Sequence, residues 1–329
     1  MRPIVHRRFS AMLGVFLDRA SLDRGDLDFG GLERVLPDLR YFPATAPAEV
    51  AGRIEAAEVV ISNKVMLDAA TIQQAPRLKL IVVVATGVNN VDLDAAAARG
   101  VTVCNCRGYG TPAVVQHVFA LLLALCTRWP DYQQAARDGR WQRASQFCLL
   151  DFPIRELAGK TLGIVGYGEL GQGVARVAEA FGMRVLVAQR PGTVEALADR
   201  TPLPALLPQV DVLSLHCPLT PATRGLIGAW ELALMRRDAI LINTARGGLV
   251  DEALLADALR RGALGGAGVD VLSLEPPVNG NPLLAPDIPN LIVTPHCAWG
   301  SRESRQRLVG QLAENIVGFL AGTPVRVVG

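Results

Sequence analysis

Short apolar runs alternate with stretches of helical periodicity throughout the second half of the chain. The apolar runs cover residues 161–165, 185–188, 212–215, 239–243, 268–271 and 291–293. They are unbroken rather than alternating, which is typical of strands buried on both faces of a parallel sheet. Helical spacing after the first run relates Val174, Val177, Ala178 and Phe181, and Asp251 is placed to cap a helix over residues 252–261. The pattern predicts a doubly wound α/β sheet.

The first half of the chain shows a weaker α/β pattern. Candidate strands cover residues 12–16, 59–61, 80–84 and 101–104. Thr111 opens a long apolar helix that extends to about residue 127, with a proline in its first turn, where the missing N–H is tolerated. The polar stretch 128–151 follows and contains Trp129 and Trp141. This stretch predicts either an arm that packs on a second subunit or a plain surface excursion.

Composition narrows the class of protein. The chain has 329 residues, enough for about two domains. Half of the residues are hydrophobic and 19% are charged, which excludes a disordered chain. Lys and Arg number 33 against 31 Asp and Glu, so the net charge of +2 gives no sign of a nucleic-acid-binding surface.

The start of the chain and its longest apolar stretches bear on location. The first ten residues are basic and an apolar stretch follows, but Asp18 and Arg19 interrupt it and no small-residue cleavage site follows. The apolar stretch 118–126 is too short to span a membrane. We therefore expect a cytoplasmic protein without a membrane segment.

Six cysteines are scattered along the chain: Cys104, Cys106, Cys126, Cys148, Cys217 and Cys297. In a chain of this size without a secretory signal, they are expected to be free thiols. Cys104 and Cys106 lack a second Cys/His pair at a suitable spacing, so no metal site is expected.

The motif Gly166-Tyr-Gly168-Glu-Leu-Gly171 lies between the first strand of the regular region and an amphipathic helix. Gly166 allows the tight turn, Gly168 lets the backbone approach a pyrophosphate, and Gly171 lets the helix pack closely on the strand. The helix N-terminus then faces the anion. In this strand–turn–helix context the motif predicts a dinucleotide-binding site.

The end of the next strand departs from the usual dinucleotide pattern. An acidic residue that binds the ribose hydroxyls is expected there, but the strand ends in Gln189 and Arg190. An arginine can pair with the 2′-phosphate of NADP, whereas Gln189 can still hydrogen-bond a ribose. The two residues favour NADP slightly and do not exclude NAD.

Polar residues follow three successive strands of the predicted sheet. Arg246 follows the fourth run, Asp270 and Glu275 lie at and after the fifth, and His296 follows the sixth. In the strand order 3-2-1-4-5-6 these three strands are neighbours, and ligands bind beyond their carboxyl ends. Each residue alone has an ordinary structural explanation, but their shared placement predicts one site.

The residue types suit hydride transfer to a 2-keto acid. Histidine titrates near neutrality and can donate the proton that the forming alkoxide needs. A carboxylate beside it favours the imidazolium, and the arginine fork matches the carboxylate of a substrate. Of the other histidines, His117 lies in an apolar helix, where packing explains it, and His216 ends a strand on the cofactor side.

The motifs over residues 166–171, 243–248, 268–277 and 294–296 resemble those of the D-2-hydroxyacid dehydrogenase family. The resemblance extends over nearly the whole chain. Residues 62–65, 107–112, 115–117 and 275–282 are most similar to bacterial glycerate dehydrogenases, also called hydroxypyruvate reductases.

The resemblance implies two domains, commonly in a homodimer. A Rossmann-type dinucleotide-binding domain, residues 108–296, would be inserted into a smaller flavodoxin-like α/β substrate-binding domain formed by residues 1–107 and 297–329. His296 would be the general acid/base, Glu275 its paired carboxylate, and Arg246 the anchor for the substrate.

The resemblance also implies which residues bind the cofactor, NAD or NADP, and the substrate. The expected cofactor-binding residues are Thr111, Gly166, Gly168, Glu169, Leu170, Gly171, Gln189, Arg190, His216, Cys217, Pro218, Thr223, Thr244, Ala245, Arg246 and Asp270. The expected substrate-binding residues are Lys64, Thr86, Gly87, Val88, Arg246, His296 and Trp299.

The leading hypothesis is an NAD(P)-dependent dehydrogenase that reduces small 2-keto acids, with hydroxypyruvate and glyoxylate first. A reductase of 2-ketogluconate or of another keto acid is the alternative within the enzyme class. A nucleotide-sensing protein similar to the C-terminal-binding corepressors is the alternative from a different class. Such proteins can keep the same His, Glu and Arg.

Overall fold

The computed structural model describes residues 12–190, 192 and 199–329, so the basic residues 1–10 lie outside the described part of the chain. The chain separates into two compact units. One comprises residues 1–110 and 300–329, and the other comprises residues 111–299. The chain passes between the units at 110/111 and 299/300, against 107/108 and 296/297 expected from the sequence.

The discontinuous unit contains a parallel sheet in the order β2-β1-β3-β4-β5 over its described residues. This is the strand order of flavodoxin-like folds. The strands are β1 (Leu13–Phe16), β2 (Asp38–Tyr41), β3 (Val59–Ser62), β4 (Leu80–Val83) and β5 (Thr102–Cys104). The sequence pattern missed β2, none of whose residues is buried, since an edge strand of this kind lacks the continuous apolar run.

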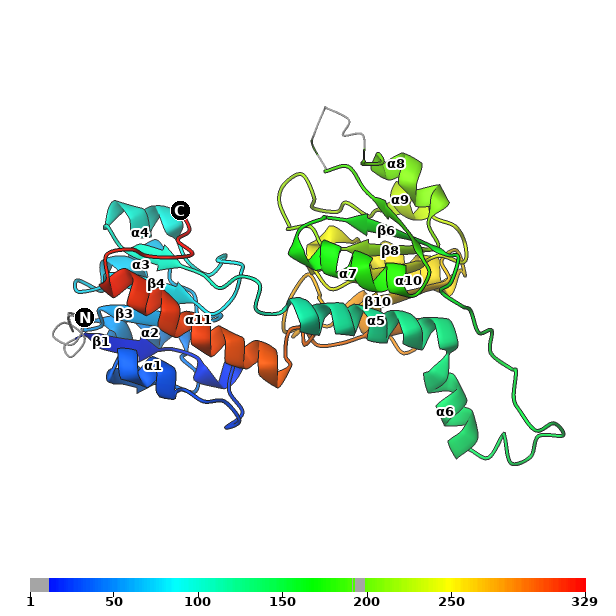
Figure 1. Ribbon diagram of the computed structural model, residues 1–329, viewed down its shortest axis with the longest axis horizontal. Helices are drawn as coiled ribbons and strands as arrows, with labels where there is room; N and C mark the ends of the chain where they lie inside the picture. The colour runs from blue at the N-terminus through cyan, green and yellow to red at the C-terminus, as the bar shows by residue number, and fades with distance from the viewer. Residues whose placement is uncertain (1–11, 191, 193–198) are drawn as a thin grey trace, which may run out of the picture. The chain divides into compact units, whose positions relative to one another are not determined.

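Helices cover both faces of this sheet (Figure 1). One face packs on α2 (Val50–Ile54), α3 (Ala69–Gln73) and α4 (Leu93–Ala98) in a core with Val15, Val60 and Ile81. The other face carries α1 (Gly30–Val35) and α11 (Arg302–Leu320), which lie side by side. Two short 3-10 helices, η1 (Arg19–Ser21) and η2 (Pro47–Glu49), follow β1 and precede α2.

The continuous unit contains a second parallel sheet in the order β11-β10-β9-β8-β6-β7 over its described residues. Its strands are β6 (Thr161–Val165), β7 (Arg184–Val187), β8 (Val212–Leu215), β9 (Ile240–Asn243), β10 (Gly266–Val269) and β11 (Leu291–Val293). Two parallel sheets with helices on both faces confirm the predicted α/β class, and the Rossmann-type architecture lies in this unit.

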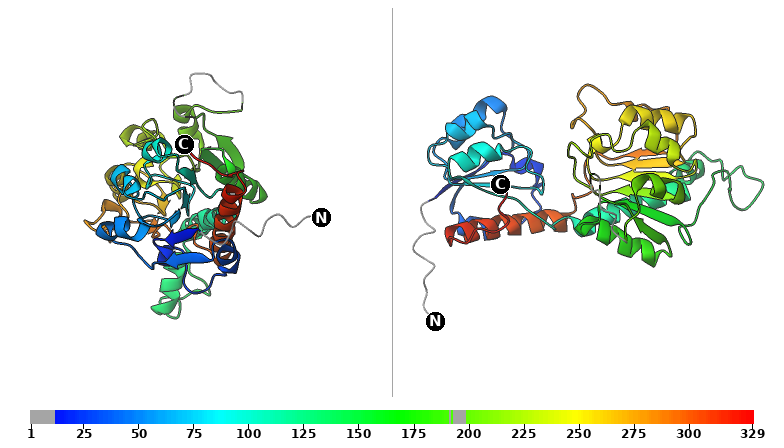
Figure 2. Two further views of the ribbon diagram at one scale, coloured as in Figure 1. Left: turned by 90° about the vertical axis from the view of Figure 1, so that its left-hand side faces the viewer. Right: turned by 90° about the horizontal axis from the view of Figure 1, so that it is seen from above.

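Helices cover both faces of this sheet as well (Figures 1 and 2). On one face α5 (Thr111–Thr127) and α7 (Glu169–Ala180) share a core with Leu162 and Ile242. On the other face α8 (Leu203–Leu206), α9 (Ala229–Leu234) and α10 (Glu252–Arg260) share a core with Leu213 and Leu241. The short helices η3 (Leu207–Gln209), η4 (Gly247–Leu249) and η5 (Pro282–Leu284) lie in the connections.

The strand order 3-2-1-4-5-6, counted over the six apolar runs, is wrong, because β8 rather than β9 lies beside β6. The third strand of that order is a single parallel bridge between Ala188 and Thr201, supported by the Gln189 N–H bond to the Thr201 carbonyl at 2.8 Å. One bridging residue leaves no apolar run in the sequence, so every later run is counted one place too early. Arg246, Asp270 and His296 still follow three adjacent strands, β9, β10 and β11.

Most other predicted elements agree with the structure to within two residues. Asp251 caps α10 by accepting the N–H groups of Ala253 and Leu254. The polar stretch 128–151 contains a helix that the sequence pattern missed, α6 (Trp129–Arg137). α6 is polar apart from one short stripe, Trp129, Tyr132 and Ala136 at helical spacing, and only Ala135 is fully buried, so the stripe was not recognised as a helix.

No single helix in the described residues is long and apolar enough to span a membrane. α5 and α6 together meet the length and composition, but they are bent by 59°. α5 is a core helix, with more than half of its residues buried against the sheet.

Candidate active site

The glycine-rich turn between β6 and α7 has the geometry that a bound dinucleotide requires. Gly166 has φ +95°, and a Cβ on it would lie 2.5 Å from the backbone N of Cys217. A Cβ on Gly171 would lie 2.2 Å from the Gly166 carbonyl oxygen. A Cβ on Gly168 would meet nothing within 4 Å, so its backbone borders open space at the start of α7. The turn therefore fits a pyrophosphate placed against the helix N-terminus.

Two buried polar atoms beside this turn have no hydrogen-bond partner among the described residues: Thr244 Oγ1 after β9 and His216 Nδ1 after β8. Unsatisfied buried polar atoms are costly, so a polar ligand is the natural partner for both. Burial lowers the pKa of His216 to about 4, so the ring is neutral and can accept or donate through one tautomer. Its Nε2 contacts Ser214 Oγ at 2.8 Å.

Most of the other residues expected around the cofactor stabilise the loops and helix ends at this edge of the sheet. Thr111 Oγ1 donates to Glu169 Oε1 at 2.6 Å and joins the starts of α5 and α7. Thr223 is buried and its hydroxyl donates to the Pro218 carbonyl at 2.7 Å, so it stabilises the loop after β8. Cys217 in the same loop is buried, which raises the pKa of its thiol to about 11. Leu170, in the first turn of α7, packs half-buried against the core that this helix shares with the sheet, and Ala245 N–H donates to the Asn243 side chain at 3.1 Å.

The carboxyl end of β7 presents Gln189, half-buried, and Arg190, exposed. A second arginine lies at the same end, which sequence reasoning missed. Arg200 precedes the bridging Thr201, and its guanidinium lies 4.7 Å from the centre of the Tyr167 ring in the glycine-rich turn. The sequence pattern did not indicate Arg200, because the strand it precedes consists of a single bridging residue, Thr201, and shows no apolar run.

His296 and Glu275 form a direct pair. Nδ1 of His296 lies 2.6 Å from Oε2 of Glu275, and both side chains are about one third exposed, at 29% and 34%. The other carboxylate oxygen, Oε1, accepts the Leu272 N–H at 2.8 Å, so Glu275 is oriented by the backbone. Because Nδ1 contacts Glu275, Nε2 is the ring nitrogen left to exchange a proton with another molecule.

The backbone of His296 is fixed on both sides. The residue has φ 51°, in the left-handed region that few non-glycine residues adopt. Its N–H donates to the Asp270 carbonyl at 2.7 Å, and its own carbonyl accepts the indole N–H of Trp299 at 3.0 Å. Trp299, expected to border the substrate, thus also holds the turn that carries His296.

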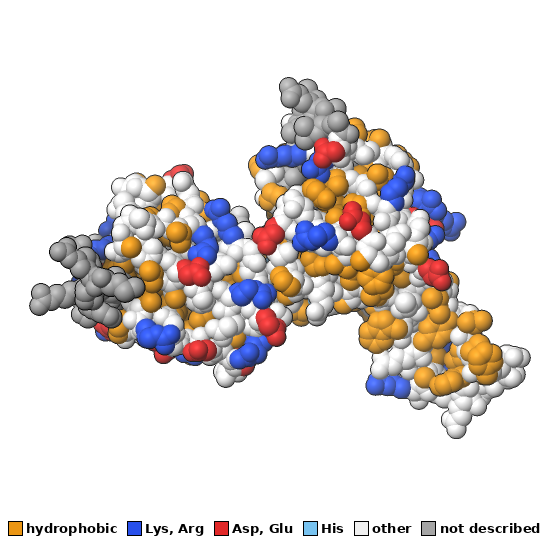
Figure 3. Space-filling view, in the orientation of Figure 1, with side chains coloured by type: hydrophobic (Ala, Val, Ile, Leu, Met, Phe, Trp, Pro, Cys, Tyr) orange, Lys and Arg blue, Asp and Glu red, His pale blue; other side chains and the backbone are white. Residues whose placement is uncertain are grey.

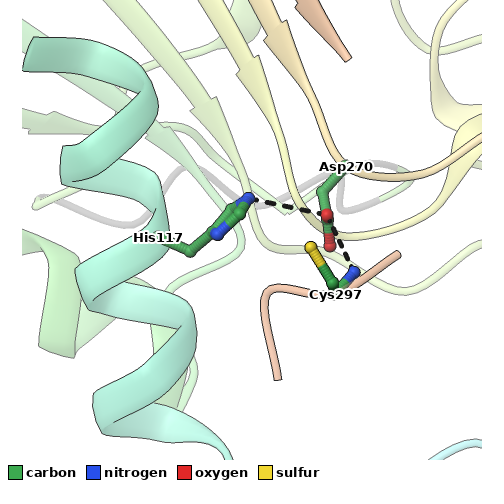
Figure 4. Close-up of side chains that lie close together, drawn as sticks. All are labelled: His117, Asp270 and Cys297. Carbon is green, nitrogen blue, oxygen red and sulfur yellow. Dashed lines mark hydrogen bonds and ion pairs between the residues drawn. The ribbon is translucent and has the colours of Figure 1, made fainter. Parts of the chain in front are cut away.

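The Asp270 side chain is 1% exposed and lies under the same turn. Its Oδ2 accepts the Ala298 N–H at 2.9 Å, and its Oδ1 accepts the Thr294 hydroxyl at 2.5 Å and the Cys297 N–H at 3.0 Å. His117 on α5 reaches the same carboxylate, with Nε2 3.5 Å from Oδ1 (Figure 4). The sequence analysis explained His117 by packing alone, whereas the structure shows that its ring also contacts Asp270 and the Thr294 hydroxyl.

Arg246 is exposed at the end of β9, and its loop is held by a residue that sequence reasoning did not single out. The side chain of Asn243, 1% exposed, donates to the Arg246 carbonyl at 2.9 Å. A Cβ on Gly247 would lie 2.0 Å from the backbone of Leu272, so this loop packs directly on the one whose N–H orients Glu275. A hollow of about 460 Å³ lies beside the His296–Glu275 pair and reaches Asp270 and Leu272.

The expected substrate-binding residues of the discontinuous unit lie after β3 and β4. The backbone N–H groups of Thr86, Gly87 and Val88 donate no hydrogen bond to any described residue, whereas the Thr86 hydroxyl donates to the Cys106 carbonyl at 2.9 Å. Lys64 follows β3 and lines a hollow of about 510 Å³ at the carboxyl ends of β1, β2 and β3. Three free N–H groups in one turn are suited to a carboxylate.

Cys104 and Cys106, weighed above as metal ligands, are buried thiols. Burial raises the pKa of Cys104 to about 11 and that of Cys106 to about 12. Among the described residues, neither thiol belongs to a group of three His, Cys, Asp or Glu side chains that could hold a metal ion.

Comparison with known proteins agrees with this geometry. The family described as D-isomer specific 2-hydroxyacid dehydrogenase, NAD binding domain, matches residues 119–298. A glycerate dehydrogenase of Methylorubrum extorquens is 48% identical over 95% of this chain and 98% of its own. A hydroxypyruvate reductase of Blautia hydrogenotrophica is 39% identical over 95% of this chain and 98% of its own.

One similar solved structure contains a bound nucleotide. It is an NADPH-dependent glyoxylate/hydroxypyruvate reductase of Sinorhizobium meliloti in complex with NADP and malonate, 28% identical, with a TM-score of 0.79 over 97% of both chains. The family match covers more than half of this chain, and the two relatives cover nearly all of it. The chain belongs to the D-isomer-specific 2-hydroxyacid dehydrogenases, and it is an NAD- or NADP-dependent oxidoreductase that acts on CH–OH groups.

Proposed function

We propose that this enzyme reduces small 2-keto acids, with hydroxypyruvate and glyoxylate as its preferred substrates. The observation that carries the proposal is the His296–Glu275 pair at 2.6 Å, a proton donor beside the loop of a carboxylate-binding arginine. The names of the relatives, a glycerate dehydrogenase and a hydroxypyruvate reductase, support the choice of substrate.

In the proposed mechanism each side chain has one task. Arg246 binds the substrate carboxylate through its planar fork, and the N–H groups of residues 86–88 add further donors. His296 donates the proton from Nε2 to the carbonyl oxygen as it becomes an alkoxide, and Glu275 stabilises the imidazolium through Nδ1. The reduced nicotinamide, when bound, supplies the hydride. The continuous unit, which contains the glycine-rich turn, would hold this cofactor.

The cofactor is NADP in preference to NAD in this proposal. Arg190 after β7 and Arg200 beside it support this choice, because two cations suit a 2′-phosphate. The position where an acidic residue would repel that phosphate holds the neutral Gln189. We expect Arg190→Ala to weaken NADPH binding by about tenfold while NADH binding changes little. Arg184→Ala, at the other end of β7, is the control. An unchanged ratio of the two dissociation constants would refute the assignment.

The substrate is tested by following nicotinamide absorbance with each cofactor against hydroxypyruvate, glyoxylate, pyruvate and 2-ketogluconate. The proposal expects the highest kcat/KM with hydroxypyruvate or glyoxylate. A clear preference for 2-ketogluconate would replace the substrate assignment and leave the family unchanged.

The assembly is proposed to be a homodimer formed through α6 and the segment that follows it. Large apolar side chains are exposed there, among them Trp129, Trp141, Phe147 and Leu150, with Phe147 90% exposed. Figure 3 shows hydrophobic side chains gathered over this region. Light scattering should give twice the chain mass, and Phe147→Asp should lower it, whereas Trp230→Asp on α9 should not. A wild-type monomer would refute the proposal.

The proposed location is the cytoplasm. All six cysteines are free, four of them buried, which supports a reducing compartment. Fractionation of the cells that make the protein tests this directly, and recovery outside the cytoplasmic fraction would contradict it.

A further inference from the structure

Three side chains with different metal-binding atoms converge beside His296. His117 comes from α5, Asp270 follows β10, and Cys297 follows β11 (Figure 4). Nε2, Oδ1 and Sγ of these residues all lie within 4.8 Å of one another. His117 is half-buried, Asp270 is buried and Cys297 is exposed, so the group opens to solvent on the side of the sulfur.

We propose that His117, Asp270 and Cys297 form a binding site for a thiophilic divalent cation of the Zn²⁺ type. One imidazole, one carboxylate and one thiol are the ligands that Zn²⁺ takes, whereas Mg²⁺ and Ca²⁺ require more oxygen atoms than the cluster offers. Water would fill the fourth position on the open side.

The spacing suits this ion. With bond lengths of about 2.0–2.3 Å, the donors of a tetrahedral Zn²⁺ site lie about 3.4–3.6 Å apart. Nε2 of His117 and Oδ1 of Asp270 are already 3.5 Å apart. Sγ of Cys297 lies within 4.8 Å of both atoms, on an exposed side chain that can adjust by rotation about a single bond.

Zn²⁺ binding at this site would release one proton to water, from the Cys297 thiol. The Thr294 hydroxyl donates to Asp270 Oδ1, so His117 Nε2, 2.9 Å from the same hydroxyl, carries its proton in the metal-free protein. On binding, that proton moves to Nδ1 of the ring through solvent, and the Cys297 thiol releases its proton to water. Asp270 accepts three hydrogen bonds through its two oxygens and releases no proton in this exchange.

A cation at this site acts on the turn that carries His296. Cys297 is the next residue, and the His296 N–H donates to the Asp270 backbone. A cation bound by Cys297 and Asp270 would hold the turn on both sides of His296, and we infer that bound Zn²⁺ inhibits the enzyme by restricting His296. This consequence rests on the proposed function, whereas the binding itself does not.

Binding is measured first, on the nucleotide-free protein, by competition with a chromophoric chelator. The site predicts one Zn²⁺ per chain. Loss of an outer-shell contact lowers metal affinity by about 10- to 100-fold, so Cys297→Ser and His117→Gln, which remove direct ligands, should weaken binding by at least about tenfold. Cys148→Ser, at the other cysteine that is not buried, should bind as the wild type does.

A spectroscopic measurement and an activity measurement complete the test. Co²⁺ should give a thiolate charge-transfer band that Cys297→Ser abolishes, and circular dichroism checks that each variant is folded. Equal Zn²⁺ affinity in the wild type and Cys297→Ser, or no thiolate band, would overturn the site. Stoichiometric binding with unchanged keto-acid turnover would overturn the inhibition alone, and an inactive wild-type enzyme that still binds Zn²⁺ would count against the proposed function instead.

Discussion

Replacing Glu275 with glutamine tests the pair on which proton donation depends. The substitution keeps the side-chain length and an oxygen for the Leu272 N–H, but it removes the charge opposite His296 Nδ1 at 2.6 Å. A hydrogen bond to a charged group contributes about 1.5–3 kcal/mol. The exposure of the two side chains, 29% and 34%, favours the lower end, about 1.5–2 kcal/mol. We therefore expect kcat to fall by about 10- to 30-fold.

Steady-state nucleotide oxidation with hydroxypyruvate measures this loss, and fluorescence titration measures nucleotide affinity. Glu49→Gln is the matched control, because it also removes a carboxylate that pairs with a cation, Arg53, at 2.7 Å, in the other unit of the chain. Its kcat should stay within about twofold of the wild type, as for an ordinary surface substitution. A Glu275→Gln enzyme with the wild-type kcat would show that the pair plays no part in turnover.

Three further predictions concern the anchor, the glycine-rich turn and acid stability. Arg246→Lys loses the planar fork, so KM for the keto acid should rise more than kcat falls, and the reverse split in a kinetic titration would refute the anchoring role. Gly171→Ala places a methyl group 2.2 Å from a carbonyl oxygen and should cost about 1–3 kcal/mol or more in urea unfolding. Gly168→Ala meets nothing within 4 Å, so it should stay as stable as the wild type while nucleotide affinity falls; equal stability of the two variants would contradict the geometry. Arg305 binds Asp26 and lowers its pKa to about 2, below the ordinary value of 3.8, so the pair stabilises the fold above about pH 4 and loses this effect as the pH falls toward 2. Asp26→Asn should therefore lower the urea midpoint at pH 6 and not at pH 2, and a constant difference would refute the assignment.

The pairing of His296 with Glu275 was predicted from the sequence although the strand order behind it was wrong. The prediction needed only that the two residues follow neighbouring strands, and β10 and β11 are neighbours in the observed sheet. The order was wrong because the strand at Thr201 is a single bridging residue, and one residue cannot form an apolar run in the sequence. The order of residues along the chain was thus sufficient to predict that these two side chains meet.

Contacts between elements distant in sequence were beyond the sequence pattern. His117 lies on α5 and reaches Asp270 across more than 150 residues of chain, and no local spacing signals that contact. Asn243, which holds the Arg246 loop, reads in sequence as the ordinary end of a strand. α6 was missed for a different reason, since its single apolar stripe of Trp129, Tyr132 and Ala136 is short and lies within an otherwise polar segment.

The direct test of the central claim compares wild type with His296→Gln. The account predicts that the wild type oxidises a reduced nicotinamide when hydroxypyruvate or glyoxylate is added. It also predicts that the variant turns over about 10²- to 10⁴-fold more slowly while binding the nucleotide with the same dissociation constant. A variant that reduces the keto acid at the wild-type rate would contradict the assignment of His296 as the proton donor.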